Sequence, residues 1–66
     1  MTNTELLKDY ISKSGYKLGY LANQVGISRF SLTQKINNKS EFKANEMDAL
    51  SRLLGIKNKE QIFFAK

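Results

Sequence analysis

Apolar residues recur at intervals of three and four along almost the whole chain, which is the spacing of one face of an α-helix. No stretch shows the sustained alternation of apolar and polar residues that is typical of a β-strand. The helical spacing falls into five segments separated by glycine, asparagine or short polar stretches. These segments are residues 2–14, 17–24, 28–37, 44–54 and 58–65. The pattern therefore predicts an all-α fold, a compact bundle of five short helices in one domain of residues 1–66.

The residues at the ends of these segments agree with helix boundaries. Thr2 and Asn58 each begin a capping box, in which a side-chain oxygen accepts from an early amide and a Glu or Gln three residues on reaches back. Ser28 is a favourable N-cap for the third segment. Glycine follows the first, second and fourth segments, and Asn37-Asn38 ends the third. Both residue types accept the left-handed backbone that commonly closes a helix.

The second and third segments are joined by residues 26–28 alone, which are Gly-Ile-Ser. Two helices joined so closely must cross sharply, because glycine permits the tight turn and Ile27 fills the angle. In the third segment Leu32 and Ile36 lie one turn apart and form its inward pair. This arrangement is typical of a helix-turn-helix. Phe42, in the following loop, is expected to fill the core, and the three tyrosines are expected to pack with their hydroxyl groups in water.

The residue inventory argues against catalysis. The chain has no cysteine and no histidine, so it lacks thiolate ligands, disulfides and the commonest general base. Its six acidic residues are dispersed rather than clustered. An enzyme, a metal site and a bound cofactor are therefore not expected. The longest apolar run is too short to span a membrane and no signal sequence begins the chain, so the cytoplasm is the expected compartment.

The net charge of +5 is concentrated in the middle of the chain. Residues 13–43 hold six lysines and arginines and one acid, whereas the bases and acids of the remaining residues cancel. A local positive field of this kind attracts a polyanion such as nucleic acid. The alternative is an ordinary lysine-rich surface in water, and charge alone does not decide between the two.

The stretch "YLANQVGISRFSLTQKINN" resembles the helix-turn-helix of the Cro-like and lambda-repressor-like family of small DNA-binding proteins. The matching positions are Leu21-Ala22, Gly26, Ile27-Ser28, Leu32 and Ile36-Asn37-Asn38. The continuation "KSEFKANEMDALSRLLGI" resembles the corresponding stretch of short phage regulators from Gram-positive bacteria. The chain departs from this family at the start of the second helix. Lys17 stands where a Ser or Thr cap is usual, and Leu18 stands where a glutamine usually contacts a phosphate.

The resemblance implies that the third helix enters the major groove of DNA. Its base-reading residues would be Ser28, Arg29, Phe30, Thr33, Gln34 and Asn37. Helical spacing agrees, because these side chains project away from the inward pair. The phosphate-contacting residues would be Lys17, Ser31, Lys35, Asn38 and Lys39. Two interpretations of Phe30 stay open, since its ring can contact a thymine methyl group or fold back onto the neighbouring helix.

The last segment carries two adjacent phenylalanines. Neighbouring residues on a helix point about 100° apart, so both rings can hardly enter one small core. We expect one ring to remain outside and a dimer interface to form from Ile62, Phe63 and Phe64. A two-fold homodimer would present its two third helices about 34 Å apart to a palindromic operator. The alternative is that both rings line a shallow core of the monomer.

The predicted function is that of a sequence-specific DNA-binding transcriptional regulator, a Cro-like phage or prophage repressor whose partner is a double-stranded DNA operator. The first alternative is a protein that binds and modulates a partner repressor in a phage genetic switch, for which the departures at Lys17 and Leu18 leave room. The second alternative is the antitoxin of a toxin–antitoxin pair. None of the three requires a small-molecule ligand, and no site for one is evident.

Overall fold

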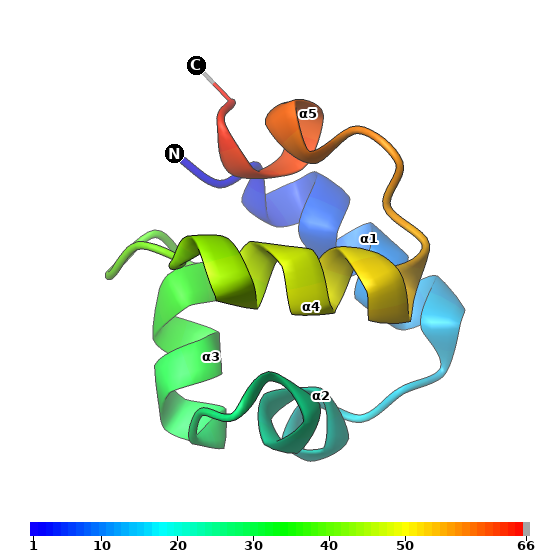
Figure 1. Ribbon diagram of the computed structural model, residues 1–66, viewed down its shortest axis with the longest axis vertical. Helices are drawn as coiled ribbons and strands as arrows, with labels where there is room; N and C mark the ends of the chain where they lie inside the picture. The colour runs from blue at the N-terminus through cyan, green and yellow to red at the C-terminus, as the bar shows by residue number, and fades with distance from the viewer. Residues whose placement is uncertain (66) are drawn as a thin grey trace.

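The computed structural model describes residues 1–65, which form five helices with no strand among them (Figure 1). These are α1 (Thr4–Ser14), α2 (Leu18–Val25), α3 (Arg29–Ile36), α4 (Ala44–Leu54) and α5 (Lys59–Phe63). The predicted all-α bundle of five short helices is confirmed. Each helix lies within its predicted segment or extends one residue beyond it. Lys66, the last residue of the predicted domain, lies outside the described residues.

The helices are arranged around α4, which crosses the middle of the molecule (Figure 1). It packs against α1, α2 and α5, while α3 packs against α1 and α2 and forms one side of the bundle. The first and last described residues lie next to each other. The Asn3 N–H donates to the Ile62 carbonyl at 2.6 Å, and the Ala65 N–H donates to the Met1 carbonyl at 2.9 Å.

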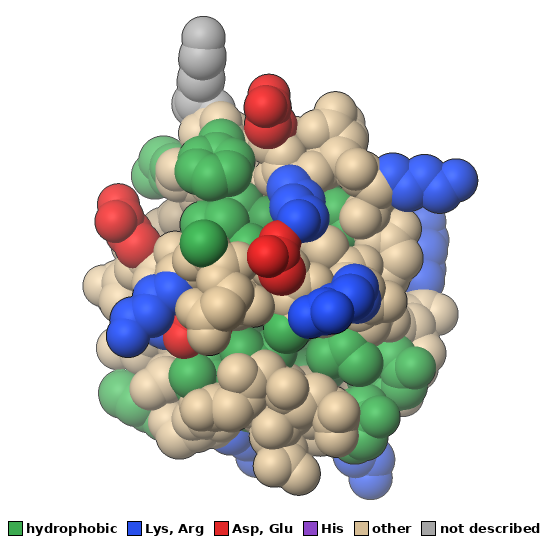
Figure 2. Space-filling model, viewed as in Figure 1, with side chains coloured by type: hydrophobic (Ala, Val, Ile, Leu, Met, Phe, Trp, Pro, Cys, Tyr) green, Lys and Arg blue, Asp and Glu red, His purple; other side chains and the backbone are tan. Residues whose placement is uncertain are grey.

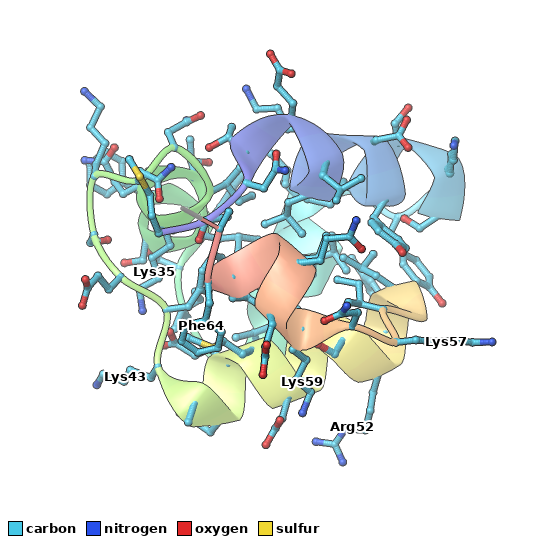
Figure 3. The ribbon with its side chains drawn as sticks, turned by 90° about the horizontal axis from the view of Figure 1, so that it is seen from above. Lys35, Lys43, Arg52, Lys57, Lys59 and Phe64 are labelled. Carbon is cyan, nitrogen blue, oxygen red and sulfur yellow. The ribbon has the colours of Figure 1, made fainter. Side chains whose placement is uncertain are left out.

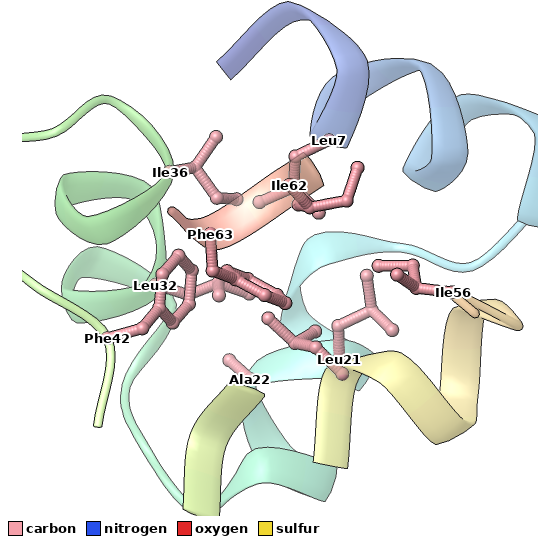
Figure 4. Packing of buried hydrophobic residues seen from close by; sticks show 10 residues of the cluster. Leu7, Leu21, Ala22, Leu32, Ile36, Phe42, Ile56, Ile62 and Phe63 are labelled. Carbon is pink, nitrogen blue, oxygen red and sulfur yellow. The ribbon is translucent and has the colours of Figure 1, made fainter. Parts of the chain in front are cut away.

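Each of the five helices contributes one fully buried side chain to the core. These are Leu7, Leu21, Leu32, Leu50 and Ile62, of which all but Leu50 are labelled in Figure 4. The rings of Phe42 and Phe63 meet edge to face beside them, 5.2 Å apart, which confirms the expectation for Phe42. Helices this short are unstable alone in water. Since a fully buried aliphatic side chain stabilises by about 1.5–3 kcal/mol, the shared core holds them in place.

The predicted N-cap of α1 is wrong by one residue. Asn3 Oδ1 accepts from the Leu6 N–H at 3.1 Å, and the helix begins at Thr4. The backbone of Thr2 is instead paired with the side chain of Asn38. The Thr2 N–H donates to Asn38 Oδ1, and the Thr2 carbonyl accepts from Asn38 Nδ2, both at 2.8 Å. This tertiary contact draws Thr2 out of the helix, so Asn3 takes over the cap.

The other predicted helix ends are largely confirmed. Ser28 and Asn58 cap α3 and α5, because each side-chain oxygen accepts from the backbone N–H three residues on, at 3.0 and 3.3 Å. Asn38 and the glycines that follow α1, α2 and α4 adopt positive φ angles. α5 ends at Phe63, short of its predicted end at residue 65. The Ala65 N–H turns away from the helix to pair with the N-terminal segment.

The two adjacent phenylalanines separate as predicted, but the predicted dimer interface needs correction. Phe64 is 58% exposed, which confirms that one ring stays outside. Ile62 and Phe63 are buried in the core of their own chain, so the interface prediction is wrong for both. Both can be buried because α5 is covered from two sides, by Asn3 at the backbone of Ile62 and by Phe42 at the ring of Phe63. Of the three residues, Phe64 alone is left for a second copy.

Candidate nucleic-acid interface

The α2–α3 pair is shaped by its three-residue connection. The Gly26 N–H donates to the carbonyls of Ala22 at 2.9 Å and Asn23 at 3.2 Å, and the φ of +90° at Gly26 turns the chain out of α2. A side chain other than glycine would be strained at this φ. The Ile27 N–H donates to the same Ala22 carbonyl at 3.0 Å, and Ser28 then caps α3. The two helices therefore cross steeply, with α2 seen end-on and α3 upright in Figure 1.

α3 has an apolar side and a polar side. Leu32 and Ile36 are buried, which confirms the predicted inward pair. Phe30 is 73% exposed and lies outside the core cluster, so the interpretation in which it folds back onto the neighbouring helix is wrong. The other five predicted base-reading residues lie along α3 and at its two ends. Ser28, Arg29 and Asn37 are exposed, and Thr33 and Gln34 are half-buried.

The hydrogen-bonding groups of these residues are only partly used within the chain. Ser28 Oγ accepts a hydrogen bond and keeps its own hydrogen, whereas Thr33 Oγ1 donates to the Arg29 carbonyl at 3.0 Å and keeps its acceptor capacity. Neither the Arg29 guanidinium nor the Gln34 amide bonds to another side chain among residues 1–65. A guanidinium and an amide are the groups that pair with the edges of guanine and adenine.

The start of α2 offers a second polar feature beside α3. Lys17 occupies the N-cap position and provides no side-chain cap, so the first amides of α2 have no capping acceptor. A depression of about 480 Å³ lies at this helix end, lined by Lys17, Leu18, Gly19, Tyr20 and Arg29. Unpaired amides at a helix start, next to two cations, suit a phosphate oxygen. The phosphate-contact prediction for Lys17 is compatible with this geometry.

The three tyrosines differ in burial, which the sequence did not predict. Tyr10 packs against the core, as expected. Tyr16 and Tyr20 are exposed, and their rings pack against each other with centroids 5.1 Å apart. Tyr20 also borders the depression that Arg29 lines. Helical spacing was the available signal. Leu21 and Ala22 point inward from α2, so the preceding residue points outward.

Leu18 takes an apolar role at the position where the resemblance expects a phosphate-binding glutamine. Its side chain packs against the core and forms part of the floor of a groove of about 350 Å³ between α1, α2 and α3. The groove is lined by Lys8, Ile11, Ser12, Leu18, Thr33, Ile36 and Asn37. Two of the predicted base-reading residues, Thr33 and Asn37, therefore border an apolar groove as well as the polar side of α3.

The phosphate-contact prediction is wrong for Lys35. Its ammonium is 2.6 Å from Glu46 Oε1, and the two side chains are only 12% and 5% exposed. The same carboxylate oxygen accepts from the Lys43 N–H at 2.9 Å, at the start of α4. A buried carboxylate requires a counter-charge, and Lys35 supplies it. The lysine, labelled in Figure 3, thus joins α3 to α4, and its ammonium is not free to contact a phosphate.

The ionisation of Glu46 reflects this arrangement. Burial opposes the charged form and by itself would raise the pKa of the carboxyl. The hydrogen bonds from Lys35 and the Lys43 N–H, together with the positive charges of both lysines, outweigh that effect. The pKa of Glu46 therefore lies below its ordinary value, and its carboxyl group is ionised at neutral pH.

The phosphate-contact prediction is also wrong for Asn38. Besides its two hydrogen bonds with the backbone of Thr2, its Nδ2 lies 3.2 Å from Thr4 Oγ1. Thr4 Oγ1 in turn donates to the Ile36 carbonyl at 2.6 Å, at the end of α3. We call Thr2, Thr4, Ile36 and Asn38 the N-terminal clamp. It fixes the C-terminal end of α3 to the first residues of the chain, and it occupies the Asn38 amide.

The remaining cations differ in whether an acid accompanies them. The ion pairs within residues 1–65 are Lys13–Asp9, Lys35–Glu46 and Lys59–Asp48. Four cations of the middle of the chain are exposed and have no such partner there: Lys17, Arg29, Lys39 and Lys43. Lys43 was not among the predicted phosphate contacts. Its place directly before the predicted helix of residues 44–54 was the signal that could have found it.

The face formed by α4 is different in character. Acidic and basic side chains alternate over it in Figure 2, and Lys59 pairs with Asp48 there. Arg52 and Lys57 lie toward the opposite end of α4 from Lys43 (Figure 3). Mixed charges attract a polyanion less than cations without accompanying acids do, so this face is the weaker candidate for contact with nucleic acid.

Comparison of the chain with protein-family models, with curated proteins and with solved structures finds no match. The described residues contain no group of acidic, cysteine or histidine side chains that could hold a metal ion. None of the helices in residues 1–65 is long and apolar enough to cross a membrane.

Proposed function

We propose that the chain is a sequence-specific DNA-binding transcriptional regulator that places α3 in the major groove of an operator, as a helix-turn-helix protein does. The carrying observation is the polar side of α3. Leu32 and Ile36 seat the helix in the core, and the side chains of Arg29, Phe30 and Gln34 form no ion pair, side-chain hydrogen bond or ring pair among residues 1–65. A helix fits the major groove, where guanidinium and amide groups discriminate between base pairs.

Phosphate contacts would hold α3 in register on the duplex. The uncapped start of α2 with Lys17 lies beside Arg29 at the first residue of α3, and Lys39 follows the last residue of α3 in the chain. Contacts of this kind position a protein without reading sequence, and they make the affinity depend on salt. Ser31 keeps its predicted phosphate role in this proposal, since its hydroxyl forms no hydrogen bond within residues 1–65.

The resemblance to Cro-like proteins supports a more specific role. In this proposal the chain is a phage or prophage repressor that acts in the cytoplasm, and its occupancy of an operator blocks RNA polymerase or a competing repressor. The middle of the chain supplies the positive charge that such an encounter requires.

A gel mobility shift against DNA from the protein's own locus, repeated at several salt concentrations, tests the proposed function. We expect a specific complex that weakens steeply as salt is raised. A random duplex of equal length is the control, and it should bind more weakly at every salt concentration. Equal binding of the two duplexes, or no complex even at low salt, would remove the operator-binding function.

A homodimer remains part of the proposal in corrected form, with Phe64 as its centre. Among residues 1–65, Met1 and Phe64 are the two most exposed large apolar side chains outside α3, and both border the same hollow. Replacing Phe64 with serine is expected to shift a dimer toward monomer, because a large apolar contact is lost. Static light scattering at micromolar concentrations, with and without operator DNA, measures this. A wild-type protein that is monomeric under both conditions contradicts the dimer.

The groove floored by Leu18 favours one second candidate, a protein that binds and modulates a partner repressor. An apolar floor at a position that commonly contacts DNA is suited to an aliphatic side chain of another protein. A Leu18→Gln change distinguishes the two candidates. If the variant loses transcriptional regulation in vivo but binds DNA as tightly as wild type, the protein-binding candidate is favoured.

A further inference from the structure

Phe30 is an apolar ring in polar surroundings. It is 73% exposed, whereas Phe42 and Phe63 are buried. It pairs with no other aromatic ring among residues 1–65, and the contacts of α3 with the core are made from the opposite side of the helix. The ring therefore keeps most of its apolar surface for a partner.

The neighbours of Phe30 restrict what that partner can be. Arg29 precedes it, and Thr33 and Gln34 follow one turn later on the same helix. A surface that accepts this side of α3 must offer hydrogen-bonding groups to Arg29 and Gln34 and an apolar group to the ring between them. The major groove offers this combination at thymine, whose C5 methyl group is the apolar group displayed among the base edges.

We infer that Phe30 reads the methyl group of a thymine in the operator, close to the base pair that Arg29 contacts. This inference rests on the proposed function, because it assigns a base to a residue of the proposed reading helix. Arg29 and Phe30 are consecutive, so they are offset by about 1.5 Å along the helix axis and about 100° around it. Base pairs are stacked about 3.4 Å apart, which places the thymine within one or two base pairs of the one that Arg29 contacts.

The test combines a change in the protein with the removal of a single methyl group from DNA. The preferred duplex is first selected from random sequences by the wild-type protein, and each thymine is then replaced by uracil, one at a time. At one thymine per half-site, uracil should weaken wild-type binding about fourfold, the effect of burying one methyl group. The same replacement should leave the dissociation constant of Phe30→Ala unchanged, while Phe30→Leu should retain part of the effect.

The outcomes separate this inference from the function on which it rests. If selection yields no preferred sequence, the proposed function fails at the first step, and the inference fails with it. If a preferred sequence is found but every thymine-to-uracil change affects wild type and Phe30→Ala equally, the thymine assignment alone is overturned. Since Phe30 is exposed, Phe30→Ala should unfold at the wild-type urea concentration, which shows that any difference arises at the DNA.

Discussion

Replacing Glu46 with glutamine is expected to lower the free energy of unfolding by about 3 kcal/mol. The change removes the negative charge that faces Lys35 at 2.6 Å and leaves a largely buried ammonium without a counter-charge. A chain of this length has a total free energy of unfolding of about 3–10 kcal/mol. The loss would therefore remove a large part of the stability of the fold. Urea denaturation followed by circular dichroism measures the effect.

Two further variants serve as controls for the buried pair. Asp48→Asn breaks the exposed pair with Lys59 and should leave the urea midpoint nearly unchanged, because exposed pairs are weak. The double variant Lys35→Met with Glu46→Leu should be more stable than Lys35→Met alone or Glu46→Leu alone, since it removes both buried charges together. A Glu46→Gln midpoint equal to that of wild type would show that the pair contributes nothing to stability.

The same pair gives the stability a defined pH dependence. Because the pKa of Glu46 is lower in the folded chain than its ordinary value of 4.5, the ionised carboxylate stabilises the fold. This contribution is fully present above pH 4.5 and is lost as the pH falls through the lowered pKa of the folded chain. The stability difference between wild type and Glu46→Gln should therefore narrow in acid and stay constant near neutrality.

Replacing Arg29 with alanine is expected to weaken operator binding by about 5- to 150-fold, the effect of losing one good base contact of about 1–3 kcal/mol. Its guanidinium is exposed and has no partner within residues 1–65, so the fold should keep its wild-type urea midpoint. Fluorescence anisotropy with operator DNA and with random DNA measures the change, which should be much smaller on the random duplex.

Lys39→Ala is the matched control for a cation that contacts phosphate. It should weaken binding to operator and random DNA alike and make the dependence of affinity on salt shallower by about one unit of the log–log slope. Gln34→Ala should follow the Arg29 pattern and relax the preference at one base pair. If all three variants lose the same affinity on both duplexes, the division into base-reading and phosphate-contacting residues is refuted.

The helices and most of the core were predictable because both follow from local periodicity. Leu32 and Ile36 are one turn apart and must share a face, so their burial follows from the helix itself. The burial of both Ile62 and Phe63 was not predictable in this way. It depends on the N-terminal segment and on Phe42, which cover α5 from two directions.

The candidate site shows the same division. Arg29 was placed correctly on the exposed side of α3 because helical spacing alone puts it there, whereas that spacing left open whether Phe30 folds back onto the neighbouring helix. Lys35 and Asn38 have the polar character of phosphate ligands, but their partners decide their roles. Glu46 lies 11 residues from Lys35 and Thr2 lies 36 residues from Asn38, and no local pattern relates positions so far apart.

The N-terminal clamp has a consequence for the entropy of association. A recognition element that must order itself on its target loses conformational freedom at that moment, which weakens the complex. α3 is capped at its start by Ser28, whose Oγ accepts from the Ser31 N–H, and its last turn is tied to the N-terminal segment through Thr4 and Asn38. The backbone of α3 is therefore ordered before any duplex arrives. The helix is thus preorganised, so the conformational entropy lost by its backbone on binding is small and reduces the affinity little.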